Sequence, residues 1–173
     1  MSVSLFLLEI TSPKAVLGDA TIDGFIGQIT VETFAWGVNA KTVEKPNSEP
    51  RTTIEPKTLS LTKHFDRSSV VLCQMMEGDE PFKATLRFID PTTKTKGQNK
   101  FDSVLEIELV GCHIENIALS ADDSGKSVSV TERLTISFEE SVTFHYRSYD
   151  TSTRSRPKAM TTRVDTPANV GKR

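Results

Sequence analysis

The hydrophobic pattern is most regular between Val128 and Tyr146. Eight of the ten even-numbered positions in this stretch are apolar or aromatic, and none of the nine odd-numbered positions is. Because side chains alternate between the two faces of a β-strand, the pattern predicts one long strand with an apolar and a polar face. Glu132 and Glu140 interrupt the apolar face. They would lie roughly 27 Å apart on one strand, too far for a paired-carboxylate hydrolase, so we interpret them as rim positions or partner contacts.

Shorter runs of alternating residues predict further strands. In residues 104–119 the apolar positions change parity near Gly111, which is typical of a β-bulge. We expect Asp90-Pro91 to end the strand that precedes it and residues 92–100 to form a polar loop, with a turn at 121–126. The strands predicted in addition to the long one are residues 3–10, 25–38, 58–65, 82–88 and 104–119.

One helix interrupts the β pattern. Asp66 is a favoured N-cap residue and Gly78 a favoured helix stop. Between them, an apolar stripe at helical spacing predicts packing of the helix against the sheet. The stripe consists of Val71, Leu72, Met75 and Met76. The sequence therefore predicts a mainly β protein, an antiparallel β-barrel or two packed sheets with one flanking α-helix.

Residues 39–57 differ from the predicted strands around them. They include three prolines, and Val43 and Ile54 are their only sizeable apolar residues. Loops longer than about 12–15 residues are uncommon in compact domains unless they are functional or disordered. We therefore expect an extended loop that a neighbouring subunit holds in place. The residues expected at this contact are Val43, Glu44, Lys45, Pro46, Asn47, Arg51 and Ile54.

The formal charge of the chain is −2, but it is unevenly distributed. Residues 151–173 hold six basic residues and one acidic residue, a net charge of +5, which leaves −7 on residues 1–150. We therefore divide the chain into a barrel domain, 1–150, and a basic C-terminal extension, 151–173. Opposite charges favour docking of the extension on an acidic neighbouring surface. The residues expected there are Arg154, Arg156, Lys158 and Arg163.

A nucleic-acid-binding arm is the competing interpretation of the extension. It is less favoured, because residues 151–173 contain no aromatic residue for base stacking and the acidic body repels phosphate. No segment approaches the ~20 apolar residues of a membrane-spanning helix, so no membrane insertion is expected. No positive charge precedes the apolar run Leu5–Leu8, and we expect no cleaved signal peptide.

Candidate catalytic and metal-binding residues form no recognisable constellation. Cys112 and His113 are neighbours on a predicted strand, so their side chains point to opposite faces. His64 and Asp66 could form a hydrolytic pair, but a helix cap is the stronger interpretation of Asp66. The histidines lack metal-binding spacing, and no phosphate-binding glycine motif is present. We expect no enzyme activity, cofactor or metal, and the two cysteines, Cys73 and Cys112, are expected to be a buried pair of free thiols.

Several motifs follow one another in a specific order. Asp23-Gly24 leads into a predicted strand that ends in Ala35-Trp36-Gly37, and the long 39–57 segment follows. Residues 61–69, LTKHFDRSS, then lead into the predicted helix. Over residues 3–150 this order resembles the Hcp family, the haemolysin-coregulated proteins of type VI secretion systems, which have a similar TKxxDxSS entry to their helix. The chain departs from the family at Val70, where a proline is frequent, and in a longer segment before Asp23.

The resemblance implies a structural role. Such proteins form six-membered rings that stack into a hollow inner tube, which a contractile sheath drives, behind a spike, from a baseplate into a target cell. The resemblance also implies assembly in the bacterial cytoplasm, secretion without a signal peptide, and carriage of effector proteins in the lumen. Residues 39–57 are then expected to make ring-to-ring contacts. The alternatives are a tail-tube protein of a phage or another contractile injection system and a small-ligand-binding β-barrel.

Overall fold

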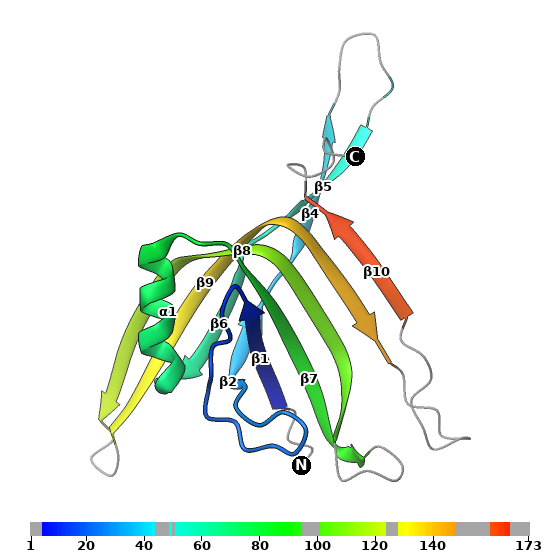
Figure 1. Ribbon diagram of the computed structural model, residues 1–173. Helices are drawn as coiled ribbons and strands as arrows, with labels where there is room; N and C mark the ends of the chain where they lie inside the picture. The colour runs from blue at the N-terminus through cyan, green and yellow to red at the C-terminus, as the bar shows by residue number, and fades with distance from the viewer. Residues whose placement is uncertain are drawn as a thin grey trace.

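Figure 1 shows a computed structural model of the chain, which describes residues 5–43, 49, 51–94, 101–123, 128–147 and 160–166. These residues form ten strands and one helix, so the prediction of a mainly β protein with one flanking helix is confirmed. The elements are β1 (Leu5–Ser12), β2 (Ile29–Val31), β3 (Thr33–Ala35), β4 (Val38–Val43), β5 (Arg51–Pro56), β6 (Leu59–His64), α1 (Arg67–Gly78), β7 (Phe82–Lys94), β8 (Phe101–Asp123), β9 (Val128–Tyr146) and β10 (Met160–Asp165).

The main sheet closes on itself through one bent segment. Its antiparallel strands follow the order β2-β1-β7-β8-β9-β6-β3. β2 and β3, at the two ends of this order, are consecutive in the chain and separated only by Glu32, whose backbone N–H donates to the Thr62 carbonyl at 2.8 Å. The segment pairs with β1 through its first half and with β6 through its second half. The single strand expected at residues 25–38 is therefore wrong, because closing the barrel requires a bend at Glu32.

The interior of this barrel is filled by apolar and aromatic side chains. Phe6, Phe34 and Phe88 contact one another edge to face, with ring centroids 4.9–5.5 Å apart, and so join β1, β3 and β7. Such T-shaped contacts are a preferred geometry for aromatic pairs. The fully buried core side chains around them include Leu8, Ile29, Leu61, Leu72, Leu86, Leu134, Ile136 and Val142.

The long strand β9 has the bounds that the sequence pattern predicted. It is long because it pairs with two strands in turn along one edge: residues 131–136 pair with β6 and residues 141–146 with β10. Along its other edge it pairs with β8. The predicted bulge at Gly111 of β8 is confirmed, since the register shifts between Val110 and Cys112. Gly111 has a φ of +71°, and a Cβ there would lie 3.0 Å from Cγ of Glu140.

Helix α1 begins and ends where the sequence indicated. The Asp66 carboxylate accepts a hydrogen bond from Ser68 N, and the Ser69 hydroxyl accepts one from Asp66 N, which together form a capping box. The helix ends at Gly78, and the left-handed residue that follows is Asp79, with a φ of 48°. Of the predicted stripe, Leu72 is buried and Val71 and Met75 pack against the core, but Met76 is 43% exposed.

Two boundary predictions and one burial prediction are wrong. β7 does not end at Asp90-Pro91 but continues to Lys94, with an irregular register after Asp90 that accommodates a residue without an N–H. Residues 92–94 therefore belong to a strand, and the rest of the predicted 92–100 loop lies outside the described residues. β8 extends to Asp123, into the predicted turn. Cys112 is buried, but Cys73 is exposed on α1, so the two free thiols are not a buried pair.

Candidate functional site

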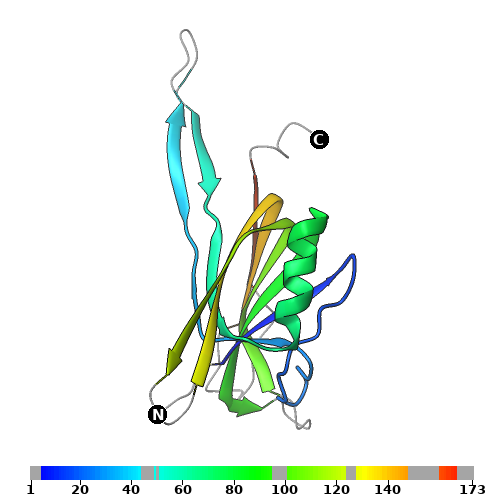
Figure 2. The same ribbon diagram turned by 90° about the vertical axis from the view of Figure 1, so that its left-hand side faces the viewer.

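A β-hairpin projects from the barrel and is the most prominent surface feature. β4 and β5 form a separate two-stranded sheet, and Figures 1 and 2 show it extending well beyond the other strands. Residues 38–42 of β4 are exposed at every position, on both faces of the strand. An isolated two-stranded hairpin is marginally stable in water. Within the described residues β4 therefore has no buried face, and its side chains are open to contact with a partner.

Three of the residues expected to form a ring-stacking contact lie on this hairpin. Val43 and Arg51 are register partners at its outer end, and Ile54 lies opposite Ala40. The intervening Glu44, Lys45, Pro46 and Asn47 lie outside the described residues. The interpretation of 39–57 as a loop needs correction, because most of these residues are strand. Half of the twelve residues in β4 and β5 are β-branched, which favours strand over loop.

The hairpin continues two barrel strands with a one-residue slip. β3 pairs with β6 up to Ala35 and Ser60, and the β4–β5 pairing starts at Val38 and Pro56. Between these two paired regions the chain advances by three residues on the β3–β4 side and by four on the β5–β6 side. An unequal count of this kind is typical of a β-bulge, which bends and twists the ribbon. Between the two paired regions, the Lys57 N–H donates to the Gly37 carbonyl at 2.9 Å.

Trp36 anchors the base of the hairpin to the barrel interior. Its ring centroid lies 5.2 Å from that of Phe144 and 6.4 Å from that of Phe138, and both phenylalanines are on β9. Its indole Nε1 is buried and has no hydrogen-bond partner among the described residues. The projecting part of the chain is thus attached through an aromatic contact with the long strand.

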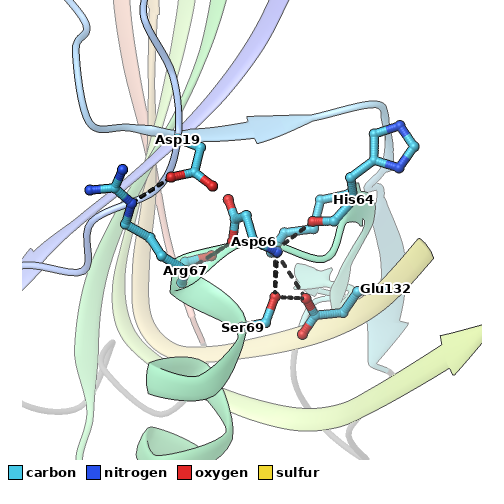
Figure 3. Close-up of polar contacts among 8 residues, drawn as sticks. Asp19, His64, Asp66, Arg67, Ser69 and Glu132 are labelled. Carbon is cyan, nitrogen blue, oxygen red and sulfur yellow. Dashed lines mark hydrogen bonds and ion pairs between the residues drawn. The ribbon is translucent and has the colours of Figure 1, made fainter. Parts of the chain in front are cut away.

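A buried lysine connects the other end of β6 to α1 and β9, and Figure 3 shows Asp66, Ser69 and Glu132 around it. The side chain of Lys63 is 0% exposed, and that of Glu132 is 1% exposed. Lys63 Nζ lies 2.9 Å from Glu132 Oε2, 2.8 Å from Asp66 Oδ1, 2.9 Å from Ser69 Oγ and 2.8 Å from the His64 carbonyl. Ser69 Oγ in turn donates to Glu132 Oε2 at 2.6 Å. These contacts satisfy the ammonium group and fix the start of the helix on the barrel.

This buried cluster corrects the interpretation of Glu132 as a rim position or partner contact, whereas Glu140 is exposed as expected. The sequence did contain a signal for it. Lys63 has the same parity as the buried Leu59 and Leu61 of β6, and Glu132 has the parity of the apolar face of β9. Opposite charges on the apolar faces of two strands indicate a buried ion pair, because each alone is too costly to bury.

Asp66 serves the cap and the cluster together. Burial raises the pKa of its carboxyl, but the hydrogen bonds from Lys63 and Ser68 outweigh that effect, so the pKa lies below its usual value of 3.8. Asp66 and His64 do not form a hydrolytic pair, since His64 Nε2 lies 2.8 Å from Glu32. The adjacent Arg67 forms an ion pair with Asp19 of the segment between β1 and β2.

The described part of the basic extension joins the main sheet. β10 pairs antiparallel with β9, from Met160 opposite Tyr146 to Asp165 opposite Ser141. Arg163, expected to dock on a neighbour, lies 2.7 Å from Asp165 of the same strand. Thr166 is buried, and its N–H donates to the Glu140 carbonyl at 3.0 Å. The other expected docking residues, Arg154, Arg156 and Lys158, lie outside the described residues.

The remaining titratable groups give no catalytic or metal-binding arrangement in the described part of the chain. His113 Nδ1 lies 3.1 Å from Asp79 Oδ1, and His145 Nε2 lies 3.4 Å from Glu108 Oε1, so each imidazole is next to a surface carboxylate. Burial raises the pKa of the Cys112 thiol to about 12, which makes it a poor nucleophile. No three potential ligand side chains come together within the described residues. No helix there has the length and apolar character required to cross a membrane.

Comparison with known proteins identifies the family. Residues 7–152 match the family model described as type VI secretion system effector, Hcp. Hcp1 from Salmonella typhimurium has a similar fold, with a TM-score of 0.71, 17% identity and coverage of 98% of each chain. A structure described as a type six secretion system protein gives a TM-score of 0.71 with 19% identity over 91% of this chain and 92% of that one.

The secreted protein Hcp3 from Pseudomonas aeruginosa also has this fold, with a TM-score of 0.60, 15% identity and coverage of 95% of this chain and 99% of that one. A search of curated protein sequences found no match. The identities to the solved structures are low enough that these likenesses show the fold alone, whereas the family model spans most of the sequence. The chain therefore belongs to the Hcp family of type VI secretion system proteins.

Proposed function

We propose that this chain is a structural subunit of the type VI secretion inner tube. Six copies form a ring through two different surfaces of each subunit, and rings stack into a hollow tube. Membership of the Hcp family supports this role, as does a barrel whose interior is occupied by its own core side chains. The partners are further copies of the chain, the contractile sheath, the spike and baseplate, and effector proteins in the lumen. The tube assembles in the cytoplasm and is secreted through the type VI system.

The observation that carries the proposal is the projecting hairpin. Residues 38–42 of β4 are exposed on both faces, and β4 and β5 pair with no other described strand. A ribbon of this kind gains stability by lying on a surface that another copy supplies. We assign ring-to-ring contact to it, with Val43, Arg51 and Ile54 on the paired strands and Glu44, Lys45, Pro46 and Asn47 between them.

A shortened hairpin tests this assignment. Lys41 and Thr53 are register partners, so deleting residues 42–52 and joining these two through Asn-Gly gives a two-residue hairpin of a favoured type. Six-subunit rings should persist in light scattering, while negative-stain electron microscopy should show no stacked tubes. The matched control is Lys41→Gln with Glu55→Gln, which removes an exposed ion pair of 3.4 Å but keeps the hairpin length.

Each outcome is informative. Exposed ion pairs contribute about 0–1 kcal/mol, so the control should form tubes as the parent does. Normal tubes from the shortened hairpin would contradict its role in stacking. A parent protein that stays monomeric at high concentration would contradict the tube function itself.

A further inference from the structure

The connection between β9 and β10 is far longer than the geometry requires. Tyr146 and Met160 are register partners on adjacent strands, and partners of this kind have Cα atoms only about 4.5–5.5 Å apart. Hairpin loops of two to five residues suffice for such a step, yet 13 residues separate the two positions in the sequence. By contrast, four residues separate Asp123 from Val128, which pair across β8 and β9. A connection of 13 residues can span up to roughly 45 Å.

β10 is also attached in a way that makes it separable from its own barrel. Its only extensive contacts among the described elements are with β9, and its first four residues are exposed, Met160 at 72%. Only its end is firmly fixed, where Val164 packs against the core and Thr166 is buried. Another copy of the strand could make these same contacts, because they all lie along one edge of β9.

The charge of the connection is compatible with a path across a second copy, because the body of every copy is acidic. Residues 147–159 hold four basic residues and one acidic residue, whereas residues 1–150 carry a net charge of −7. In a closed ring a neighbouring copy stands at a fixed short distance, so its β9 edge is presented at a high effective concentration. Exchange of an identical element between copies needs no new contacts.

We propose that β10 is exchanged between subunits, so that β10 of one copy pairs with residues 141–146 of β9 in the next copy around the ring. The partner is a second copy of this chain. This inference rests on the ring assembly proposed above and adds the element that links its members. The strand edge and the strand that fills it both belong to the described residues; only the path between them differs from pairing within one chain.

Disulfide trapping across the β9–β10 register distinguishes the two pairings. Tyr146→Cys with Met160→Cys, and separately Thr143→Cys with Arg163→Cys, place thiols on directly opposed positions. These pairs differ in their place in the ladder, so one is a non-hydrogen-bonded pair with closer side chains. Cys73→Ser removes the exposed native thiol, and the buried Cys112 can remain. After mild oxidation of assembled protein, exchange predicts a non-reducing gel ladder of subunit multiples that ends at six.

Two controls define what the gel reports. Ser120→Cys with Thr131→Cys bridges β8 and β9 at register partners that a short connection keeps in one chain, so it must run as a monomer. Met160→Cys alone must give no ladder. Deleting residues 149–158 leaves three connecting residues, enough for pairing within one chain, and should convert the ladder into a cross-linked monomer.

Light scattering of the same samples separates this inference from the tube function. Six-subunit rings whose trapped pairs all run as monomers would overturn strand exchange and leave the tube function standing. Monomers in solution that run as cross-linked monomers would overturn both. A ladder that persists in the deletion variant would also overturn the exchange, because a three-residue connection spans only roughly 10 Å and the ladder would then come from random cross-linking between copies.

Discussion

Lys63 and Glu132 are register partners across β6 and β9 and form an ion pair of 2.9 Å that is fully removed from solvent. One carboxylate oxygen of Glu132, Oε1, is buried without a hydrogen-bond partner among the described residues. The pair joins the long strand to the helix cap through Asp66 and Ser69. Removing one partner leaves an uncompensated charge in the core, which is costly, whereas replacing both together is far milder.

We therefore predict strong coupling between the two positions. Lys63→Met or Glu132→Leu alone should lower the free energy of unfolding by roughly 3–5 kcal/mol. The double variant should lose much less than the sum of the two losses. Urea unfolding followed by circular dichroism measures all four proteins of this double-mutant cycle. Additive losses would show that the pair is not coupled.

The lowered pKa of Asp66 predicts a specific loss of folding stability in acid. Its pKa is lowered in the folded protein from a usual value of 3.8, so ionised Asp66 stabilises the fold above that value. The stabilisation is lost as pH falls through the lowered folded pKa. The stability advantage of the parent over Asp66→Asn should therefore be constant from pH 7 to about 5 and shrink below about pH 4. Urea unfolding at each pH measures it, and a difference that does not change down to pH 3 would contradict the role of the charge.

Replacement by alanine should destabilise the protein at Gly111 but not at Gly37. Gly111 has a positive φ, and a Cβ there would press on Glu140, so Gly111→Ala should cost about 1–2 kcal/mol or more, as left-handed backbone does for other residues. Gly37 has no heavy atom within 4 Å of a built Cβ, and Gly37→Ala should be nearly neutral. Thermal unfolding compares them directly, and equal shifts in melting temperature would contradict the bulge argument.

Trp36 is the only tryptophan in the chain, so the unfolding of variants without it is followed by circular dichroism. Trp36→Ala removes a ring packed on Phe138 and Phe144 and should cost about 3 kcal/mol, the lower end for aromatic truncation because the residue is only half-buried. Trp36→Phe should cost less. If Trp36→Ala unfolds in urea like the parent, the aromatic contact does not anchor the hairpin.

The two thiols should react at very different rates. Cys73 is exposed, whereas Cys112 is buried and its pKa is raised to about 12. A disulfide reagent at pH 8 should therefore modify one thiol of the folded protein promptly and the second only in denaturant. Cys73→Ser is the control and should show no prompt reaction. Prompt modification of both thiols in the parent would mean that β8 opens readily at Cys112.

The elements with a strict local pattern were predictable from the sequence. β9, the bulge at Gly111 and the Asp66 cap each follow from alternation, parity or a residue with a specific backbone role. The family followed from the order of short motifs, and the family match confirms it.

Other features depend on partners that are distant in the sequence. The bend at Glu32 exists because β1 and β6 lie on opposite sides of one segment. The hairpin was missed because its prolines and charges resemble those of a loop, and because β4 has no buried face that would give an alternating apolar pattern. Predicting the ion pair of Lys63 would have required knowing that β6 pairs with β9, about 70 residues away in the sequence. Predicting that β10 joins the main sheet would likewise have required its pairing with β9.

The pairing of β6 with β9 also constrains the order in which parts of the chain can fold during synthesis. While the ribosome is still making the middle of the chain, β1 can pair with β2 and β3 with β6. The second partners of β1 and β6, which are β7 and β9, are made later. Until residue 132 emerges, Lys63 has no Glu132 beside it and that side of β6 stays open to solvent or to a chaperone. Because long-range pairings form slowly and a domain folds as a unit, we expect the barrel to close only after the last third of the sequence, which contains β9, has been made.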